Sequence, residues 1–320
     1  MMTPKKGKVE PRNSFAEDVL MGLTRTPKKI SSRYFYDKTG SEIFQEIMKL
    51  DEYYLTRYEQ EVLHLCASEI TKHLYNSFRL TELGAGDAEK TVTLIRALIE
   101  AKREFNYYPI DISEKAQQQC IENIPASVKC NFIVADNLVG LQKLKTLAPQ
   151  QTLVLFLGSS IGNYTPLEAV EFLRAVNNEL QPNDLLLIGF DLVKDVNVMQ
   201  KAYDDSQGIT ARFNLNLLRR INKELDGYFE LGNFAHKAWF DKECQAMRSG
   251  LISTCKQRVP IGAFGRTFGF EKNELLHTEM SCKYTLASIA DLAQQSGWVL
   301  RENFEHPKKD MFCDSLWIKP

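Results

Sequence analysis

The sequence lacks the features that mark several classes of protein. It contains no apolar run approaching the ~20 residues that a helix needs to cross a bilayer, and its beginning lacks the apolar stretch of a signal peptide. Its 40 Lys and Arg are balanced by 41 Asp and Glu, without a long basic run. Because nonspecific phosphate binding requires a surplus of positive charge, we expect no nucleic-acid partner. We also expect no membrane partner and a cytoplasmic location.

Cysteine and histidine are too scattered to indicate a disulfide framework or a metal site. The seven cysteines are odd in number, contain no C-x-x-C pair and stand mostly in apolar segments, which is typical of reduced core residues. The five histidines form no close ligand pair, so we expect no zinc or other metal. With 44% hydrophobic residues, the 320-residue chain can bury a substantial core, and we expect a globular monomer.

Short β-rich runs alternate with amphipathic stretches between residues 78 and 190. The first of them read "FRLTEL", "AEKTVTLIRALIEA", "NYYPI", "SEKAQQQCIEN" and "CNFIVA". This alternation predicts an α/β fold with a parallel sheet and helices on both of its faces. Near the end of the sequence, "WVLREN" and "MFCDSLWIK" are joined by the turn-like "FEHPKKD" and predict a closing antiparallel hairpin.

The rhythm changes after Asp191. A helical stretch, "TARFNLNLLRRINKEL", is followed by segments that alternate like antiparallel strands, which predicts an inserted α+β subdomain. We therefore divide the chain into three parts. They are an N-terminal helical segment over 1–60 that joins the subdomain, a sheet domain over 61–195 and 286–320, and the inserted subdomain over 196–285.

A glycine-containing turn follows the first predicted strand. In "TELGAGDAEK", Gly84 and Gly86 let the backbone approach a nucleoside closely, although a glycine turn after a strand is often only a turn. Glu89 occupies the position of the third glycine of a dinucleotide fingerprint, where its carboxylate would repel a pyrophosphate. The acidic surroundings suit S-adenosylmethionine, which has no phosphate and carries a cationic sulfonium. A nicotinamide-dependent oxidoreductase is correspondingly disfavoured.

Acidic residues also end the next two predicted strands. Asp111 follows "YYPI" and is placed to accept hydrogen bonds from ribose hydroxyls, and Asp136 follows "CNFIVA" and is placed to meet the adenine amino group. Ligands of parallel α/β sheets bind at the carboxyl ends of the strands. Each aspartate taken alone is equally well explained as a helix cap. Agreement at three consecutive strand ends favours a nucleoside site.

The chain resembles the histidine Nα-methyltransferases of ergothioneine biosynthesis from about residue 27 to 317. The motifs that carry the resemblance are "RYFYDKTGSEIFQEI", "DEYYLTRYE", "ELGAGDAEKT", "PIDIS", "FLGSSIGNYTP", "GFDLVKD", "AYDDSQGITARFN" and "TEMSCKY". The resemblance implies a Rossmann-like S-adenosylmethionine methyltransferase sheet with an inserted substrate-binding subdomain. It also implies trimethylation of the α-amine of free L-histidine to histidine betaine (hercynine), the first step of ergothioneine biosynthesis.

The resemblance implies a set of site residues, of which Tyr53, Asn163 and Tyr203 are also the catalytic candidates. At Asn137 the chain departs from an aromatic residue associated with the family, which puts in doubt only the packing on adenine. The implied cofactor contacts are Gly84, Lys90, Asp111, Asp136 and Asn137. The implied substrate contacts are Tyr53, Asn163, Tyr203, Phe213, Met247, Glu279 and Ser281.

The substrate residues have the chemistry that an amino acid with a polar ring requires. Asn163 can donate its amide to the substrate carboxylate, with support from the Tyr203 hydroxyl. Glu279 and Ser281 are two residues apart on a predicted strand, so they share a face on which they can bond the two polar edges of an imidazole, while Met280 points away. Without the resemblance, each of these residues is as well explained as a turn, core or strand-surface residue.

Two other functions stay open at this stage. An α-N-methyltransferase for another free amino acid, such as tryptophan, would use the same scaffold without the imidazole contacts, and Glu279 and Met247 argue against it. The chain could also be a noncatalytic amino-acid sensor. No general base is assigned, although Tyr53 and nearby waters could relay the proton of the amine.

Overall fold

The computed structural model describes residues 14–320, which form two compact units. Residues 50–202, 240–247 and 280–320 make up the larger one, called the sheet unit below. Residues 14–49, 203–239 and 248–279 make up the other, called the second unit. The three predicted domain ranges stay a prediction, and the two units are described separately.

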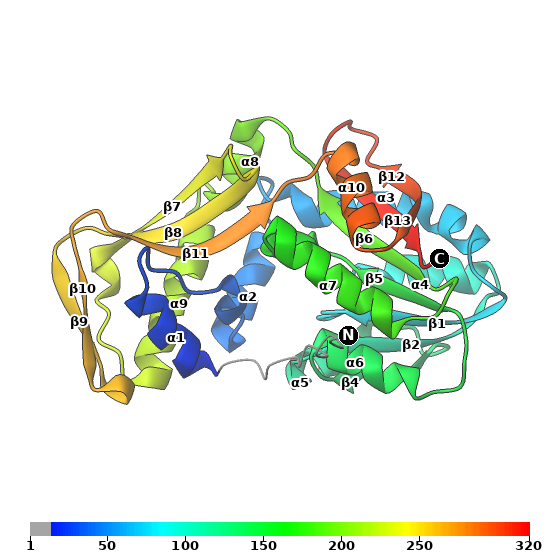
Figure 1. Cartoon of the computed structure of the whole chain (residues 1–320), viewed down its shortest axis with the longest axis horizontal. Helices are drawn as coiled ribbons and strands as arrows, with labels where there is room; N and C mark the ends of the chain where they lie inside the picture. Colours follow the sequence, from blue (N-terminus) through cyan, green and yellow to red (C-terminus); the bar gives the residue numbers. More distant parts are fainter. Residues whose placement is uncertain (1–13) are drawn as a thin grey trace, which may run out of the picture. The chain divides into compact units, whose positions relative to one another are not determined.

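An eight-stranded sheet forms the centre of the sheet unit (Figure 1). Its order is β12-β13-β6-β5-β1-β2-β3, with β4 also paired to β2. The first six strands in sequence pair in parallel, and β13 pairs antiparallel with both β6 and β12, so the predicted parallel sheet and closing hairpin are confirmed. The strands are β1 (Ser77–Leu83), β2 (Glu104–Asp111), β3 (Lys129–Cys130), β4 (Ile133–Val134), β5 (Thr152–Phe156), β6 (Leu185–Asp191), β12 (Val299–Glu305) and β13 (Phe312–Ile318).

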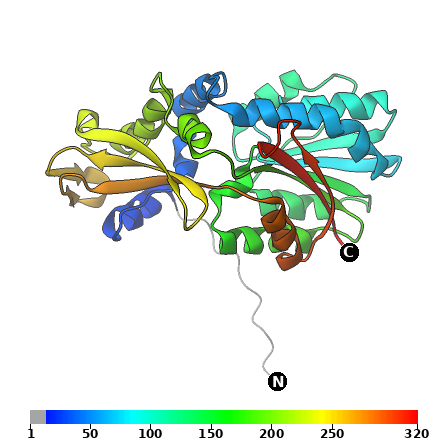
Figure 2. The same ribbon diagram turned by 90° about the horizontal axis from the view of Figure 1, so that it is seen from above.

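Helices cover both faces of this sheet, as the view in Figure 2 shows. Along β5, Leu153 and Leu155 pack into an apolar core with α3 and α4, whereas Val154 and Phe156 pack into a second core with α6, α7 and α10. Because both faces of the strand are covered, all four residues from Leu153 to Phe156 are apolar. The helices are α3 (Tyr54–Lys72), α4 (Thr91–Glu100), α5 (Glu114–Asn123), α6 (Asn137–Lys145), η2 (Ser160–Asn163), α7 (Pro166–Glu179), α8 (Val196–Tyr203) and α10 (Leu286–Gln295).

The predicted strand "CNFIVA" differs from the structure, which contains two short strands, β3 and β4, in its place. Asn131 and Phe132 lie between the two strands, although the Asn131 N–H still donates to the Tyr107 carbonyl of β2 at 2.8 Å. Both strands pair only with β2, at one edge of the sheet. An edge segment has half the ladder hydrogen bonds of a central strand, so a local departure from regular pairing costs less there.

The second unit combines a three-stranded sheet, in the order β11-β8-β7, with the antiparallel hairpin β9-β10. The predicted helix that begins near residue 210 is present as α9, which packs against α2. The last residues of β7 and β11 and the first of β8 belong to the sheet unit. The elements are α1 (Phe15–Thr24), η1 (Ser32–Phe35), α2 (Lys38–Ile47), α9 (Ile209–Leu225), η3 (Leu231–Asn233), β7 (Phe234–Asp241), β8 (Ala246–Ser253), β9 (Gln257–Ile261), η4 (Gly262–Phe264), β10 (Arg266–Phe270) and β11 (Leu275–Cys282).

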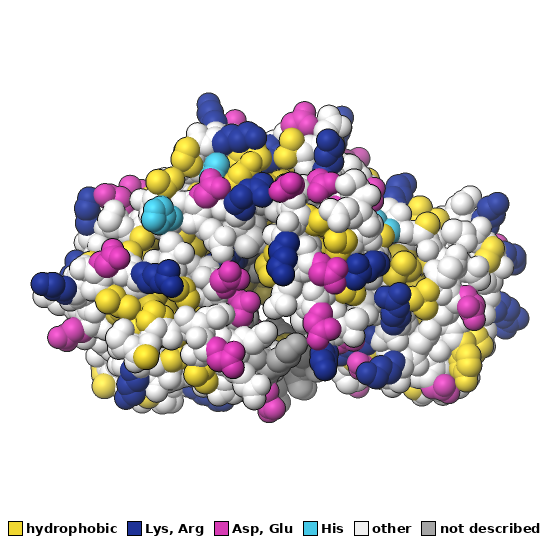
Figure 3. Space-filling model, turned by 180° about the vertical axis from the view of Figure 1, so that it is seen from behind, with side chains coloured by type: hydrophobic (Ala, Val, Ile, Leu, Met, Phe, Trp, Pro, Cys, Tyr) yellow, Lys and Arg dark blue, Asp and Glu magenta, His cyan; other side chains and the backbone are white. Residues whose placement is uncertain are grey.

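Charged side chains of both signs are interspersed on the surface shown in Figure 3. Within residues 14–320, no helix combines the length and the low polarity that a membrane span requires.

Candidate active site

The glycine turn after β1 has the backbone that a close ligand contact requires. Gly84 and Gly86 have φ of +71° and +54°, in the left-handed region that favours glycine. A Cβ built on either residue would have no atom within 4 Å, so the space beside the turn is open. The turn is tied to the neighbouring strand because the Gly84 N–H donates to the Ile110 carbonyl at 2.9 Å.

Asp111 connects this turn to the end of β2. Its Oδ2 accepts from the Gly86 N–H at 3.0 Å, and its Oδ1 accepts from the Ser113 N–H at 2.9 Å. Each carboxylate oxygen has two lone pairs, so each can accept a further hydrogen bond from a hydroxyl group. The backbone therefore positions the carboxylate, and its contact with a ribose remains a prediction.

Asp136 caps the helix that follows it. Its side chain accepts from the Leu138 N–H at 3.1 Å at the start of α6, where Asn137 is the first helical residue. The capping explanation for this aspartate is thus present in the structure. Because a capping carboxylate keeps lone pairs for a second donor, the assignment of both residues to the adenine remains a prediction.

Lys90 forms an ion pair with Glu59, a residue that the sequence analysis did not single out. Glu59 is fully buried, and its other oxygen accepts from the Gly158 N–H at 2.6 Å. Burial lowers the pKa of Lys90, but the Glu59 carboxylate outweighs it, so that pKa is raised overall. A cation is therefore held beside the turn that follows β5, where it suits a ligand carboxylate.

A second buried carboxyl, Glu82, lies in β1 just before the glycine turn. Thr91 and Tyr107 both donate hydroxyl hydrogen bonds to its Oε2 at 2.6 Å. Burial raises the pKa of Glu82 to about 7, against the opposing effect of these hydrogen bonds and of Lys90. The Glu82 carboxyl connects β1 to β2 and to the first turn of α4, and so stabilises the strand end from which the glycine turn begins.

The turn carrying Asn163 packs directly on the end of β11. A Cβ at Gly162 would lie 2.9 Å from the Cys282 carbonyl oxygen and 3.2 Å from Ser281 Oγ. The turn begins with Gly158 and Ser159, both in the left-handed region, and ends at the exposed Asn163. Two of the predicted substrate residues, Asn163 and Ser281, are thereby brought close together within the sheet unit.

A buried ionic cluster holds Ser281. The Lys283 ammonium donates to Ser281 Oγ at 3.0 Å and pairs with Asp191 at 2.6 Å. Asp191, at the end of β6, also pairs with Lys194 and accepts from the Tyr54 hydroxyl at 3.0 Å. Burial lowers the pKa of Lys194 to about 8, partly opposed by Asp191.

The same cluster includes the start of α3, because Tyr54, which donates to Asp191, is the first residue of that helix. Tyr53, a predicted substrate residue, directly precedes it in the chain. Asp191 is a fourth acidic strand end, and its place after the apolar run "DLLLIGF" was a signal in the sequence. Lys283 had no such signal, because its partner lies 92 positions earlier. Asp191, Lys194 and Lys283 are thus functional candidates that sequence reasoning missed.

The second unit contains Tyr203, Phe213 and Glu279. Tyr203 and Phe213 are buried, and the Phe213 ring lies 4.9 Å from Phe35 and 5.4 Å from Tyr36. Burial, followed by the charge of Glu279 and by Tyr203, raises the pKa of Tyr36. The Tyr36 ring itself packs edge-on against Phe44 at 5.3 Å. Tyr36 was also missed by sequence reasoning.

The two methionines of the predicted site region are both buried. Met247 is fully enclosed at the start of β8, and Met280 lies in the apolar core that includes α7 and α10. Met280 separates Glu279 from Ser281 on β11 and takes the core side of that strand. The pocket role of Met247 remains a prediction.

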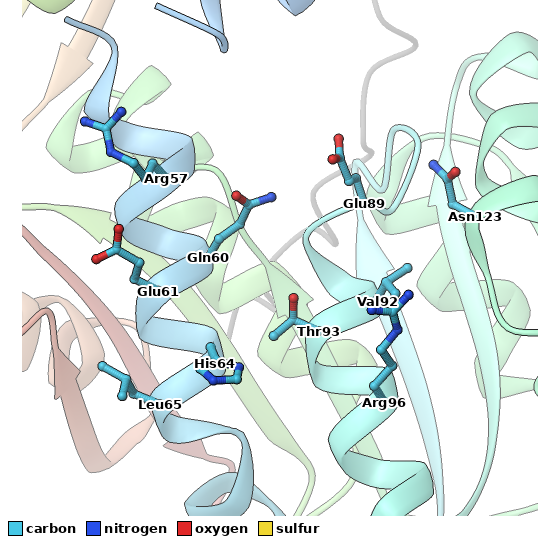
Figure 4. A pocket seen from close by; sticks show the side chains of 10 residues that line it. All are labelled: Arg57, Gln60, Glu61, His64, Leu65, Glu89, Val92, Thr93, Arg96 and Asn123. Atoms are coloured by element: carbon cyan, nitrogen blue, oxygen red, sulfur yellow. The ribbon is translucent and has the colours of Figure 1, made fainter. Parts of the chain in front are cut away.

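A cavity of the sheet unit lies away from these residues. It has a volume of about 740 Å³ and lies along α3 and α4, with Gln60 and His64 on one side and Thr93 and Glu89 on the other (Figure 4). Its lining includes none of the predicted cofactor or substrate residues. Within residues 14–320, no group of three or more His, Cys, Asp or Glu side chains is arranged to hold a metal ion.

Comparisons with known proteins agree on one family. Residues 15–318 match the model of a family described as histidine-specific methyltransferase, SAM-dependent. The chain is 37% identical over 282 residues to the histidine N-alpha-methyltransferase of Mycobacterium tuberculosis, covering 86% of each chain. The protein of the same name from Mycolicibacterium smegmatis is 36% identical, with 87% of each chain covered.

A fungal relative matches over a shorter stretch. Ergothioneine biosynthesis protein 1 of Neurospora crassa is 34% identical over 203 residues, which cover 62% of this chain and 23% of that protein. The family match spans nearly all of the described chain, and the bacterial relatives are similar along most of their own length. The chain therefore belongs to the S-adenosylmethionine-dependent, histidine-specific methyltransferases.

Proposed function

We propose that the protein transfers methyl groups from S-adenosylmethionine to the α-amine of free L-histidine. Three transfers would give histidine betaine, in the first step of ergothioneine biosynthesis. Family membership supports the reaction class. The contact between Gly162 and Ser281, which brings Asn163 close to the end of β11, is the structural observation that carries the proposal.

The residues around the glycine turn fit the cofactor. The open, left-handed turn at Gly84 and Gly86 leaves room for a nucleoside, and Asp111 keeps lone pairs for its ribose hydroxyls. Lys90 would hold the carboxylate of the methionine part, with Asp136 and Asn137 at the adenine. When bound, S-adenosylmethionine supplies an electrophilic methyl group.

Hydrogen-bond polarity supports the assignment of the imidazole contacts. An ammonium group can only donate hydrogen bonds, so Ser281 Oγ accepts from Lys283. The hydroxyl proton of Ser281 is then available to another acceptor. Glu279 Oε2 accepts from the Ser249 hydroxyl, and an ionised carboxylate can only accept. A neutral imidazole, with one N–H and one lone pair, is complementary to this pair of side chains.

The chain's task in the reaction is alignment. Asn163 and Tyr203 would fix the substrate carboxylate, which determines the end of the amino acid that faces the methyl donor. The amine must be neutral to attack, and Tyr53 would relay its proton; Tyr54, the next residue in the chain, donates to Asp191. Phe213 and Met247 would exclude water from the site.

The decisive assay offers all twenty free amino acids to the wild type and to Glu279→Ala with labelled S-adenosylmethionine, and follows methylated products by mass. We expect the wild type to prefer histidine. We expect Glu279→Ala to lose most of this activity and to gain in relative activity on larger apolar substrates such as tryptophan, because the carboxylate that would accept from the ring N–H is gone. A wild type that ignores histidine would overturn the proposal.

Cofactor binding is tested separately by calorimetry with S-adenosylhomocysteine. Asp111→Ala should bind it about ten- to a hundredfold more weakly, because hydrogen bonds to a charged group contribute about 1.5–3 kcal/mol. If Asp111→Ala binds S-adenosylhomocysteine as tightly as the wild type, the assignment of the nucleoside site is wrong.

We also propose that the protein works as a monomer in the cytoplasm. All seven cysteines are free thiols in the structure, which is compatible with a reducing compartment. Light scattering coupled to size-exclusion chromatography should give the mass of one chain, and twice that mass would overturn the monomer.

A further inference from the structure

Four hydrogen bonds in the second unit connect the backbone of Tyr203 to the carboxylate of Glu279. His236 Nε2 lies 2.9 Å from the Tyr203 carbonyl oxygen, and His236 Nδ1 lies 3.0 Å from Asn214 Nδ2. Asn214 Nδ2 lies 3.1 Å from Ser249 Oγ, which lies 2.9 Å from Glu279 Oε2. The chain of contacts joins α8, α9, β7, β8 and β11.

The groups at the two ends of this network, a carbonyl and a carboxylate, determine the direction of each hydrogen bond. A carbonyl oxygen only accepts, so His236 Nε2 carries the proton and Nδ1 of the neutral ring accepts from Asn214. The Asn214 amide donates its second proton to Ser249 Oγ, whose own proton is then directed to Glu279. The network thus ends with a hydroxyl that donates to a carboxylate, a charge-assisted hydrogen bond.

Burial makes this arrangement rigid. Asn214 and Ser249 are 1% and 0% exposed, and the Ser249 carbonyl accepts from the Thr278 hydroxyl at 3.1 Å. Asn214 and Ser249 are closed off from solvent, so the hydrogen bonds of Asn214 Nδ2 and Ser249 Oγ depend on their neighbours in the network. The Glu279 carboxylate, which is only partly buried, is fixed at one oxygen by this enclosed group.

We propose that Ser249 and Asn214 are positioning residues that determine amino-acid specificity by fixing the Glu279 carboxylate. The inference rests on the proposed function, in which Glu279 accepts the N–H of the substrate ring. The hydrogen bond from Ser249 holds the carboxylate in one orientation, in which it would accept from the substrate ring. Specificity for a ring that donates a hydrogen bond then depends on residues that do not contact the substrate.

Ser249→Ala tests this with a minimal change in volume. We expect the KM for histidine to rise about tenfold, the effect of losing a hydrogen bond to a charged group, while kcat and S-adenosylhomocysteine affinity stay nearly unchanged. The ratio of activity on histidine to activity on phenylalanine should fall by a similar factor. Ser249→Thr, which keeps the hydroxyl, should restore most of the preference.

Ser253→Ala is the matched control. Ser253 is a fully buried serine of the same strand, but its hydroxyl donates to the Cys255 carbonyl at 2.8 Å and lies outside the network. We expect it to lower thermal stability without changing the histidine preference. If Ser253→Ala and Ser249→Ala alter the preference equally, or if Ser249→Ala leaves it unchanged, the positioning role is wrong.

A spectroscopic measurement separates this inference from the proposed function. The carboxyl carbon of Glu279, labelled with ¹³C, should titrate at higher pH in Ser249→Ala than in the wild type, because a hydrogen bond to the charged form lowers a pKa. Asn214→Ala should shift it in the same direction. A wild type that ignores histidine but shows this shift would overturn only the proposed function, whereas an unchanged titration would overturn the network.

Discussion

At the scale of single residues, the candidate site combines side chains that a sequence can and cannot reveal. Asp111 and Asp136 were predicted because strand-end acids recur at a fixed place in α/β folds. Glu59 and Lys283 were not, because each is functional only through a partner far along the chain, to which no local pattern points. Asp136 shows the converse, since a predicted ligand contact is also an ordinary helix cap.

Substitution of Asn163 tests its predicted contact with the substrate. Its amide is assigned to the substrate carboxylate, so Asn163→Ala should raise the KM for histidine about tenfold or more and slow turnover. The affinity for S-adenosylhomocysteine should stay nearly unchanged, because the glycine turn and Asp111 are not altered. Calorimetry with each ligand measures the two effects, and equal damage to both affinities would mean that the turn serves the cofactor.

At the scale of elements, most of the fold followed from the period of the apolar residues. The alternation of β-rich and amphipathic segments predicted the parallel sheet, and it was confirmed, as was the antiparallel pairing of β12 and β13. The segment at 130–135, predicted as one strand, forms two short strands on β2, because an edge segment tolerates a local break in regular pairing. The close packing of η2 on β11 had no signal beyond Gly162 itself.

Gly162→Ala tests whether that packing matters for function. The new Cβ would lie 2.9 Å from the Cys282 carbonyl oxygen, so η2 must shift away from Ser281. We expect the KM for histidine to rise about tenfold and stability to fall by about 1–3 kcal/mol, as for other overpacked sites. Steady-state kinetics and denaturant unfolding measure the two effects.

Gly269→Ala is the control for this substitution. A Cβ at Gly269 meets no atom within 4 Å, and we expect its kinetics and stability to match the wild type closely. Should Gly162→Ala lose stability but keep its KM for histidine, the turn would be a packing feature without a role in substrate binding.

At the scale of the whole molecule, the sheet unit contains buried carboxyl groups whose ionisation affects its stability. Asp314 is fully buried in β13, and neither of its oxygens has a hydrogen-bond partner within the described chain. A Cβ at Gly189 would overlap Glu59 Oε1 and lie 3.2 Å from Asp314 Oδ1, so two carboxyl groups flank one glycine. Burial first, and then the charge of Glu59, raise the pKa of Asp314 well above its usual value despite Lys90.

The raised pKa of Asp314 makes the stability of the fold depend on pH. An acid whose pKa is raised in the folded state stabilises the fold fully below its unfolded pKa, near ~3.9 for aspartate. That contribution is lost as the pH rises from there through the raised folded pKa. Glu82 acts in the same direction, and its contribution is lost between about pH 4.5 and about 7.

Asp314→Asn should therefore stabilise the protein at alkaline pH, because asparagine resembles the protonated acid and removes a buried ionisable group from the vicinity of Glu59. We expect a rise in Tm of a few degrees at pH 8, at about 2–4 °C per kcal/mol, and a smaller gain at pH 5. Scanning calorimetry across this range measures the difference. The matched variant Asp310→Asn, at an exposed loop position between β12 and β13, should show no pH-dependent gain. A gain for Asp314→Asn that is equal at both pH values would mean that Asp314 is ionised in the folded protein throughout this range.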